Sequence, residues 1–239
     1  MKHFPIYGAV GALCFFATSA AQAVVIDLTF EGINSSYPTT SYANVGGFYD
    51  GGTSSDGTSG TNYGISFPTN ALAICLNTLG NSCSNTSHGG LGDPASADTG
   101  LFFLSGSNTY LDKASGFTTG FSFDYSAINE GGAVQVYSGL DGSGTLLATL
   151  NLLTTPSDCG PAADGAAFCP FVDSGVTFGG TAESISFNGV ANQIVFDDVT
   201  FGSAIVGGGA VPEPITLSVF GAGLAGAIAM RRRKKRQQA

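Results

Sequence analysis

The chain has no tryptophan, two histidines, two methionines and only eight lysines and arginines among 239 residues. Lys2 lies near the N-terminus, six basic residues lie in Arg231–Arg236, and only Lys113 lies between them. Of the 17 Asp and Glu, only Glu213 lies outside residues 24–210, so this segment carries 16 acidic residues and one basic residue. Such a surface cannot neutralise phosphates, which excludes nucleic-acid binding and leaves phosphoryl transfer without cationic groups. Divalent cations and neutral sugars remain as small partners.

Candidate catalytic residues are scarce. His88 is the only histidine in residues 24–210, so a Ser–His–acid triad would require it to meet two partners from elsewhere in the chain. We therefore predict that the protein is not an enzyme. A secreted glycoside hydrolase is the weaker alternative, because that chemistry needs only two carboxylates at a suitable separation.

The lack of tryptophan also removes the largest aromatic surface that could contact a sugar. Tyrosine can serve instead, since its ring is apolar and its hydroxyl is polar. Tyr49 and Tyr63 are the candidate glycan contacts, although core packing or loop anchoring explains these residues equally well.

Long stretches with helical periodicity are missing, and apolar and polar residues alternate instead. About ten short strands, separated by turn-forming residues, predict an all-β fold. We expect residues 24–206 to form a single antiparallel β-sandwich of jelly-roll type, followed by a glycine linker at 207–210. Besides the segments discussed next, the expected strands are residues 24–30, 64–67, 71–76, 101–104, 176–178, 184–187 and 193–201.

Two segments show the strand pattern most clearly. Phe117–Tyr125 places aromatic residues on one face and small or polar residues on the other, which predicts a half-buried strand. Val134–Ser138 and Thr145–Leu153 flank the glycine-rich Gly139–Gly144, which predicts a β-hairpin.

The first 23 residues are typical of a secretory signal peptide. Lys2 and His3 precede an apolar stretch around Ala9–Ala17, and Ala21-Gln22-Ala23 fits a signal-peptidase site. We expect export by the Sec route and removal of residues 1–23. A permanent N-terminal anchor is disfavoured because the apolar stretch is too short to span a bilayer comfortably.

The last 29 residues, 211–239, contain three signals in order. Val211-Pro212-Glu213-Pro214 is followed by the apolar run Ile215–Met230 and then by six basic residues: Arg231, Arg232, Arg233, Lys234, Lys235 and Arg236. A helix over residues 215–230 would be about 24 Å long, slightly short of the bilayer core. We predict a transmembrane helix at 215–230 with a cytoplasmic stop-transfer sequence at 231–236, which places the body on the opposite side of the membrane.

This tail resembles the PEP-CTERM sorting signal of Gram-negative bacteria that make exopolysaccharide. The resemblance rests on Pro212-Glu213-Pro214, the short apolar stretch and the arginine-rich end. The resemblance implies recognition by a membrane exosortase and cleavage near the motif. The protein is then expected as an inner-membrane-anchored precursor that is later released to the cell envelope or outside the cell.

The body resembles a recurrent group of PEP-CTERM proteins of unknown function from about residue 45 to 202. The resemblance implies no activity. It rests on residues 48–53 (FYDGGT), 62–67 (NYGISF), 120–123 (GFSF), 138–144 (SGLDGSG) and 196–202 (FDDVTFG).

The cysteine count suits an exported protein. Cys14 leaves with the signal peptide, and the four that remain form an even number in an oxidising compartment. The spacing favours disulfides between Cys75 and Cys83 and between Cys159 and Cys169, although three pairings are open. Neither spacing fits a zinc pattern.

A second resemblance concerns a calcium site. Residues 29–32 (TFEG) and 196–199 (FDDV) are similar to the paired terminal strands of jelly-roll carbohydrate-binding modules. The resemblance implies that an early Glu and a late Asp meet and bind a structural Ca²⁺, which prefers several hard oxygen ligands. Glu31, Asp197 and Asp198 are the candidate ligands, and the alternative is that the two aspartate carboxylates lie at the sheet rim in water.

These features predict an exported cell-envelope or extracellular-matrix protein with a structural or adhesive role linked to exopolysaccharide, such as a biofilm matrix. The main alternative is a carbohydrate-binding module with a Ca²⁺ site. Expected partners are signal peptidase and exosortase during export, the membrane, and exopolysaccharide.

Overall fold

The computed structural model describes residues 24–34, 42–76, 99–155 and 170–208. Contacts divide the chain into two units, one of Ala23–Val211 and one of Met1–Gln22 with Pro212–Ala239. All described residues lie in the first unit. The predicted signal peptide, the predicted sorting tail, His88 and three of the four body cysteines lie outside the described residues. Within the described part of the chain, no helix is long and apolar enough to cross a membrane.

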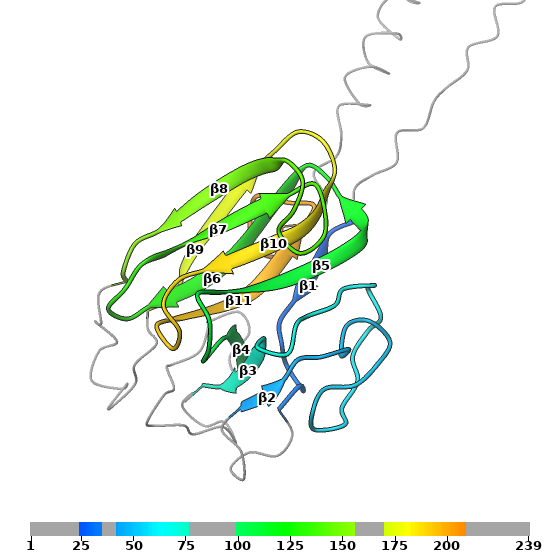
Figure 1. Ribbon diagram of the computed structural model, residues 1–239, viewed down its shortest axis with the longest axis vertical. Helices are drawn as coiled ribbons and strands as arrows, with labels where there is room; N and C mark the ends of the chain where they lie inside the picture. The colour runs from blue at the N-terminus through cyan, green and yellow to red at the C-terminus, as the bar shows by residue number, and fades with distance from the viewer. Residues whose placement is uncertain (1–23, 35–41, 77–98, 156–169, 209–239) are drawn as a thin grey trace, which may run out of the picture. The chain divides into compact units, whose positions relative to one another are not determined.

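The described residues form two antiparallel sheets packed face to face, which confirms the predicted all-β sandwich (Figure 1). The larger sheet has the order β2-β3-β4-β11-β6-β9, with β1 also paired to β11. Its strands are β1 (Ile26–Leu28), β2 (Tyr42–Asn44), β3 (Leu72–Cys75), β4 (Thr99–Phe102), β6 (Gly120–Ala127), β9 (Val172–Thr177) and β11 (Ile194–Phe201). The smaller sheet has the order β5-β10-β7-β8 and consists of β5 (Asn108–Phe117), β7 (Gly132–Tyr137), β8 (Leu146–Leu152) and β10 (Ala182–Asn188).

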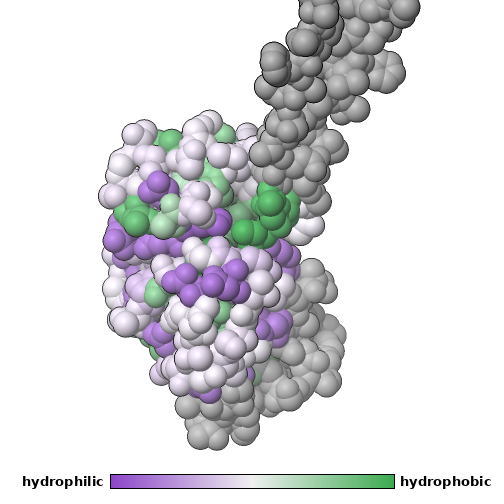
Figure 2. Space-filling view, turned by 90° about the vertical axis from the view of Figure 1, so that its right-hand side faces the viewer, coloured by the Kyte–Doolittle hydropathy of each residue, from purple (hydrophilic) through white to green (hydrophobic). Residues whose placement is uncertain are grey.

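Phenylalanine fills the space between the sheets. Phe121 and Phe123 of β6, Phe196 of β11 and Phe187 of β10 are fully buried, and their ring centroids lie 4.7–6.3 Å apart in tilted or edge-on pairs. Each such side chain contributes roughly 1.5–3 kcal/mol by leaving water. The face shown in Figure 2 accordingly carries mainly hydrophilic or neutral residues, with hydrophobic ones in small patches.

A second, smaller cluster covers the outer face of the larger sheet. Ile74, Leu76, Phe102 and Val195 are buried there, with Phe171 packed against them. Every residue of the central strands β6 and β11 is buried, so both faces of these strands are covered.

The predicted strand at Phe117–Tyr125 is wrong in two respects. Phe117 ends β5 and Gly120 begins β6, because Thr119 turns the chain with a φ of 77°. Residues 120–125 are also buried on both faces rather than half-buried, since Ser122 and Asp124 are covered as well. The hairpin of β7 and β8 is confirmed, and residues 64–67 contribute only one bridge, Ser66 to Asp112.

The chain after β11 returns over the outer face of the larger sheet. The Ser122 hydroxyl donates to the Ser203 carbonyl at 3.2 Å, and the Gly207 N–H donates to the Thr200 hydroxyl at 3.0 Å. A side chain at Gly175 would collide with the Ala204 carbonyl. The first residues of the predicted glycine linker are thus hydrogen-bonded to the body.

Gly175→Ala should destabilise the protein by about 1–3 kcal/mol, because the new methyl group meets backbone that cannot move without breaking these hydrogen bonds. Gly179→Ala is the matched control, since a Cβ there meets nothing within 4 Å. Urea unfolding of the purified protein measures both. Equal stability of the two variants would show that the returning segment does not lie against β9.

Candidate functional site

The site begins at an interruption in β11. The pairing register between β11 and β6 shifts between Asp197 and Thr200, and Asp198 has a φ of 45°. Phe196 precedes this bulge and Val199 follows it, yet both side chains lie in the main core. In a regular strand, Phe196 and Val199 would point to opposite faces. The bulge allows both side chains to enter the core, and the two carboxylates of Asp197 and Asp198 lie within the bulge.

On the side of β11 away from β6, the neighbouring strand changes at the bulge. Phe196 pairs with Leu101 of β4, whereas Val199 pairs with Leu28 of β1. The chain leaving β1 therefore passes beside the beginning of β4. Glu31 connects the two strands, because its carboxylate accepts a hydrogen bond from the Thr99 N–H at 2.9 Å.

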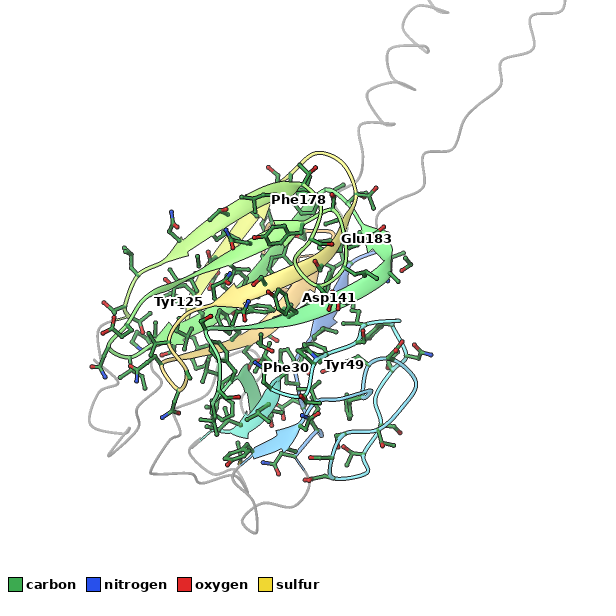
Figure 3. All side chains as sticks on the ribbon, viewed as in Figure 1. Phe30, Tyr49, Tyr125, Asp141, Phe178 and Glu183 are labelled. Carbon is green, nitrogen blue, oxygen red and sulfur yellow. The ribbon has the colours of Figure 1, made fainter. Side chains whose placement is uncertain are left out.

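A long loop between β2 and β3 closes one side of this region. Tyr49 lies in the loop, and its hydroxyl accepts a hydrogen bond from the Phe30 N–H at 2.9 Å. Its ring packs edge-on against Phe30 at 6.0 Å and stacks on Tyr63 at 6.2 Å. Figure 3 shows Phe30 and Tyr49 next to each other.

The loop is also held to the chain after β1. The hydroxyls of Ser54 and Thr58 both donate to the Ile33 carbonyl, at 3.2 and 3.1 Å. Within the loop, the Tyr63 and Ile65 N–H groups donate to the Tyr49 carbonyl. These bonds make the segment a fixed wall rather than a flexible insertion.

A cavity of about 370 Å³ lies between the loop and the end of β1. It has two carboxylates, three hydroxyls and three aromatic rings on its wall: Asp27, Glu31, Thr29, Ser59, Thr61, Phe48, Tyr49 and Tyr63. The Asp27 carboxylate accepts a hydrogen bond from the Thr200 hydroxyl at 3.1 Å, which fixes it at the junction of β1 and β11.

The cavity wall is electrostatically negative. Burial raises the pKa of the Tyr49 phenol, and the nearby charges of Asp197 and Glu31 raise it further, while the hydrogen bond from Phe30 lowers it. Both carboxylates thus lie close enough to Tyr49 to act on its ionisation. Tyr49 remains a neutral phenol throughout the physiological range.

The structure brings several sequence-predicted residues together. Glu31, Tyr49 and Tyr63 line one cavity, and Asp197 lies near Tyr49. Tyr49 is only 5% exposed and its hydroxyl is bound to the backbone, so its ring anchors the loop and its hydroxyl is engaged in the fold. Tyr63 is half-buried and presents the more accessible ring.

The calcium site stays a prediction. Asp197 and Asp198 are 0% and 3% exposed, so they do not lie at a wet sheet rim. The Asp197 carboxylate accepts a hydrogen bond from the Asp198 N–H at 2.8 Å. Among the residues that the structure describes, no group of three or more His, Cys, Asp or Glu is placed to hold a metal ion.

Sequence reasoning missed Asp27, Thr29, Ser59 and Thr61. The first two lie in a segment predicted as an ordinary strand, and the others lie in a loop whose fold depends on distant hydrogen bonds to Ile33. Cys75 is disulfide-bonded, and its predicted pairing stays a prediction because Cys83, Cys159 and Cys169 lie outside the described residues.

Residues 210–234 match the PEP-CTERM protein-sorting motif. The match confirms the sorting signal predicted from Pro212-Glu213-Pro214 and the residues after it. The molecule is thus a β-sandwich protein with a signal for export and processing at the membrane. The chain therefore carries a PEP-CTERM sorting motif, which implies processing by an exosortase. No curated protein matches the chain.

Several solved β-domains are weakly similar. CsCBM6-3 from Clostridium stercorarium, in complex with cellobiose, is 20% identical over 46% of this chain and 77% of that one, with a TM-score of 0.32. The adhesin domain of Lys-gingipain from Porphyromonas gingivalis W83 is 14% identical over 74% and 97%, with a TM-score of 0.38. Scores of this size carry no argument about ligands, so the fold class rests on the observed strands and their pairing.

Tyr49→Phe should lower stability by about 1–3 kcal/mol at neutral pH, because the buried Phe30 N–H loses its acceptor. Above pH 10, the ordinary pKa of tyrosine, an unfolded chain releases the Tyr49 proton while the folded chain keeps it. The free energy of unfolding therefore falls as pH rises above 10, and Tyr49 contributes up to about 1.4 kcal/mol per pH unit to this fall. The variant should lack this contribution.

Urea unfolding between pH 7 and 11.5 measures both effects. Tyr42→Phe, which removes a phenol from a side chain that is 44% exposed, is the control for stability at neutral pH. If Tyr49→Phe loses stability above pH 10 as steeply as the unmodified protein, the phenol is not held neutral by its surroundings.

Proposed function

We propose that this exported protein binds neutral glycans through the cavity at the end of β1 and thereby adheres to exopolysaccharide. The observation that carries the proposal is the composition of the cavity. Carboxylates, hydroxyls and aromatic rings converge there from β1, the chain after it and the β2–β3 loop.

Each kind of group in the cavity suits one part of a sugar. Carboxylate and hydroxyl oxygens accept hydrogen bonds from sugar hydroxyls, and an aromatic ring contacts the apolar C–H face. The cavity volume of about 370 Å³ is near the lower end of the range for small-molecule sites. It therefore suits the end of a glycan better than a long segment of one.

Charge selects a neutral glycan. Asp27 and Glu31 line the cavity, and an acidic sugar would meet like charge there. Lys113 is the single basic residue of the body, and its ammonium donates to the Tyr63 carbonyl and the Ser115 hydroxyl. No other cation of the body could pair with a uronate or a phosphate.

The sorting signal gives this binding a biological setting. The protein is exported and processed at the membrane, so its cavity meets the polysaccharides of the envelope and matrix. These two properties together support an adhesive role in an exopolysaccharide layer.

Glu31→Gln and Tyr63→Ala should each weaken glycan binding by roughly 5- to 100-fold, which corresponds to about 1–3 kcal/mol. Glu31→Gln keeps an oxygen for the Thr99 N–H, so the fold should be retained. Asp50→Asn is the matched control, because Asp50 is an exposed acidic residue of the same loop that does not line the cavity.

The measurement uses the full chain purified in detergent, with arrays of neutral oligosaccharides and the exopolysaccharide of the producing cell. Parallel assays in EDTA and in millimolar Ca²⁺ test the calcium hypothesis. Absence of retention on every glycan, or equal loss in Asp50→Asn, would contradict the proposal. Release of reducing sugar would support a hydrolase instead.

A further inference from the structure

A separate surface, on the other sheet, carries an ordered set of polar side chains. Sheet β5-β10-β7-β8 forms one layer of the sandwich (Figure 1). Leu111, Val134, Val136, Ile185 and Phe187 point into the core. Because successive side chains of a strand alternate between faces, the residues between these point outward.

The strand register arranges the outward residues in rows across the sheet. One row runs Tyr110, Ser186, Gln135 and Thr149, and the next runs Asp112, Ser184, Tyr137 and Leu146. Ser184 and Ser186 on the inner strand β10 are small and almost fully buried. The larger side chains stand on β5 and β7 to either side of them.

Hydrogen bonds fix the polar groups of this face. The Gln135 side-chain oxygen accepts from the Tyr137 hydroxyl at 3.0 Å and from the Asn188 amide at 3.2 Å. The Asn108 amide donates to the Tyr110 hydroxyl at 2.6 Å. Because these side chains already hold one arrangement, a ligand would bind them with little loss of side-chain entropy.

The turn between β7 and β8 supports one end of the face. The Gly142 N–H donates to the Ser184 hydroxyl at 3.0 Å, and the Asp141 N–H donates to the Asp112 carboxylate at 2.9 Å. A Cβ at Gly142 would lie 2.6 Å from the Tyr110 ring. The turn, where Figure 3 labels Asp141, therefore holds the Tyr110 ring in place.

We propose that the outer face of sheet β5-β10-β7-β8 is a second carbohydrate-binding surface, which takes a length of neutral polysaccharide chain across Tyr110, Gln135 and Tyr137. Amides and phenols donate and accept hydrogen bonds as sugar hydroxyls require, and the two rings can contact C–H faces. The surface is built on strands of one sheet, and no residue that lines the cavity at Glu31 belongs to it.

The charge and composition of this face favour a neutral polysaccharide as its ligand. The two rows contain one charged side chain, Asp112, and no basic one, so anionic polymers gain no ion pair there. A protein partner would require an apolar centre. Leu146, which is 48% exposed, is the single large aliphatic residue in the rows and lies on the edge strand β8.

Tyr137→Ala and Gln135→Ala should each weaken binding of the full chain to a neutral polysaccharide by 10-fold or more, while binding of short oligosaccharides at the cavity is retained. Glu31→Gln should show the opposite selectivity. Tyr42→Ala is the control for removing an exposed tyrosine, since Tyr42 lies on β2 in the other sheet. Affinity electrophoresis in gels that contain neutral or uronate-rich polysaccharides measures the change.

The proposal is overturned if the folded Tyr137 and Gln135 variants migrate like the unmodified protein in every neutral gel. It is also overturned if the uronate-rich polymer retards the protein most, or if the two variants change its oligomeric state instead of its retardation. Loss of polysaccharide binding in the Tyr137 and Gln135 variants, together with unchanged oligosaccharide binding in Glu31→Gln, would support this surface and reject the cavity.

Discussion

The arrangement of the molecule depends on one constraint, which is that β11 must be buried on both faces while it carries two adjacent carboxylates. A regular strand would place Asp197 or Asp198 among the phenylalanines of the core, where an unpaired charge is costly. The bulge between Asp197 and Thr200 interrupts the regular alternation of side chains between the two faces of β11. The carboxylates therefore need not point into the phenylalanine core. The bulge also marks the point along β11 where pairing with β4 ends and pairing with β1 begins. The cavity lies next to this point.

Much of the fold could be predicted from the sequence because alternation of apolar and polar residues survives in most strands. The β7–β8 hairpin follows from its glycine-rich turn, and the pairing of β1 with β11 follows from resemblance to paired terminal strands. The turn at Thr119 could not be predicted, since threonine at positive φ is unusual and the aromatic alternation continues through it. The residues of the cavity wall could not be predicted from the sequence either. Ser59 and Thr61 reach Glu31 only because long-range hydrogen bonds hold their loop to Ile33.

The proposed surfaces suit the two ways in which a matrix protein meets a polysaccharide. The proposed cavity would receive a chain end, whereas the proposed sheet face would receive a chain along its length. Two modest sites on one exported body would raise its avidity for a polymer without either site being strong. The scarcity of basic residues then favours neutral polymers over acidic ones, and the sorting signal implies export and processing at the membrane.

The central claim is that this exported β-sandwich binds neutral polysaccharide through defined surfaces. Hydrogen exchange of the full chain, followed with and without the polysaccharide of its own cell, tests that claim most directly. The account predicts slower exchange of backbone amides in residues 59–63 and in β5 and β7, with the rest of the sandwich unchanged. Unchanged exchange everywhere, or protection confined to the opposite sheet at β9, would contradict it.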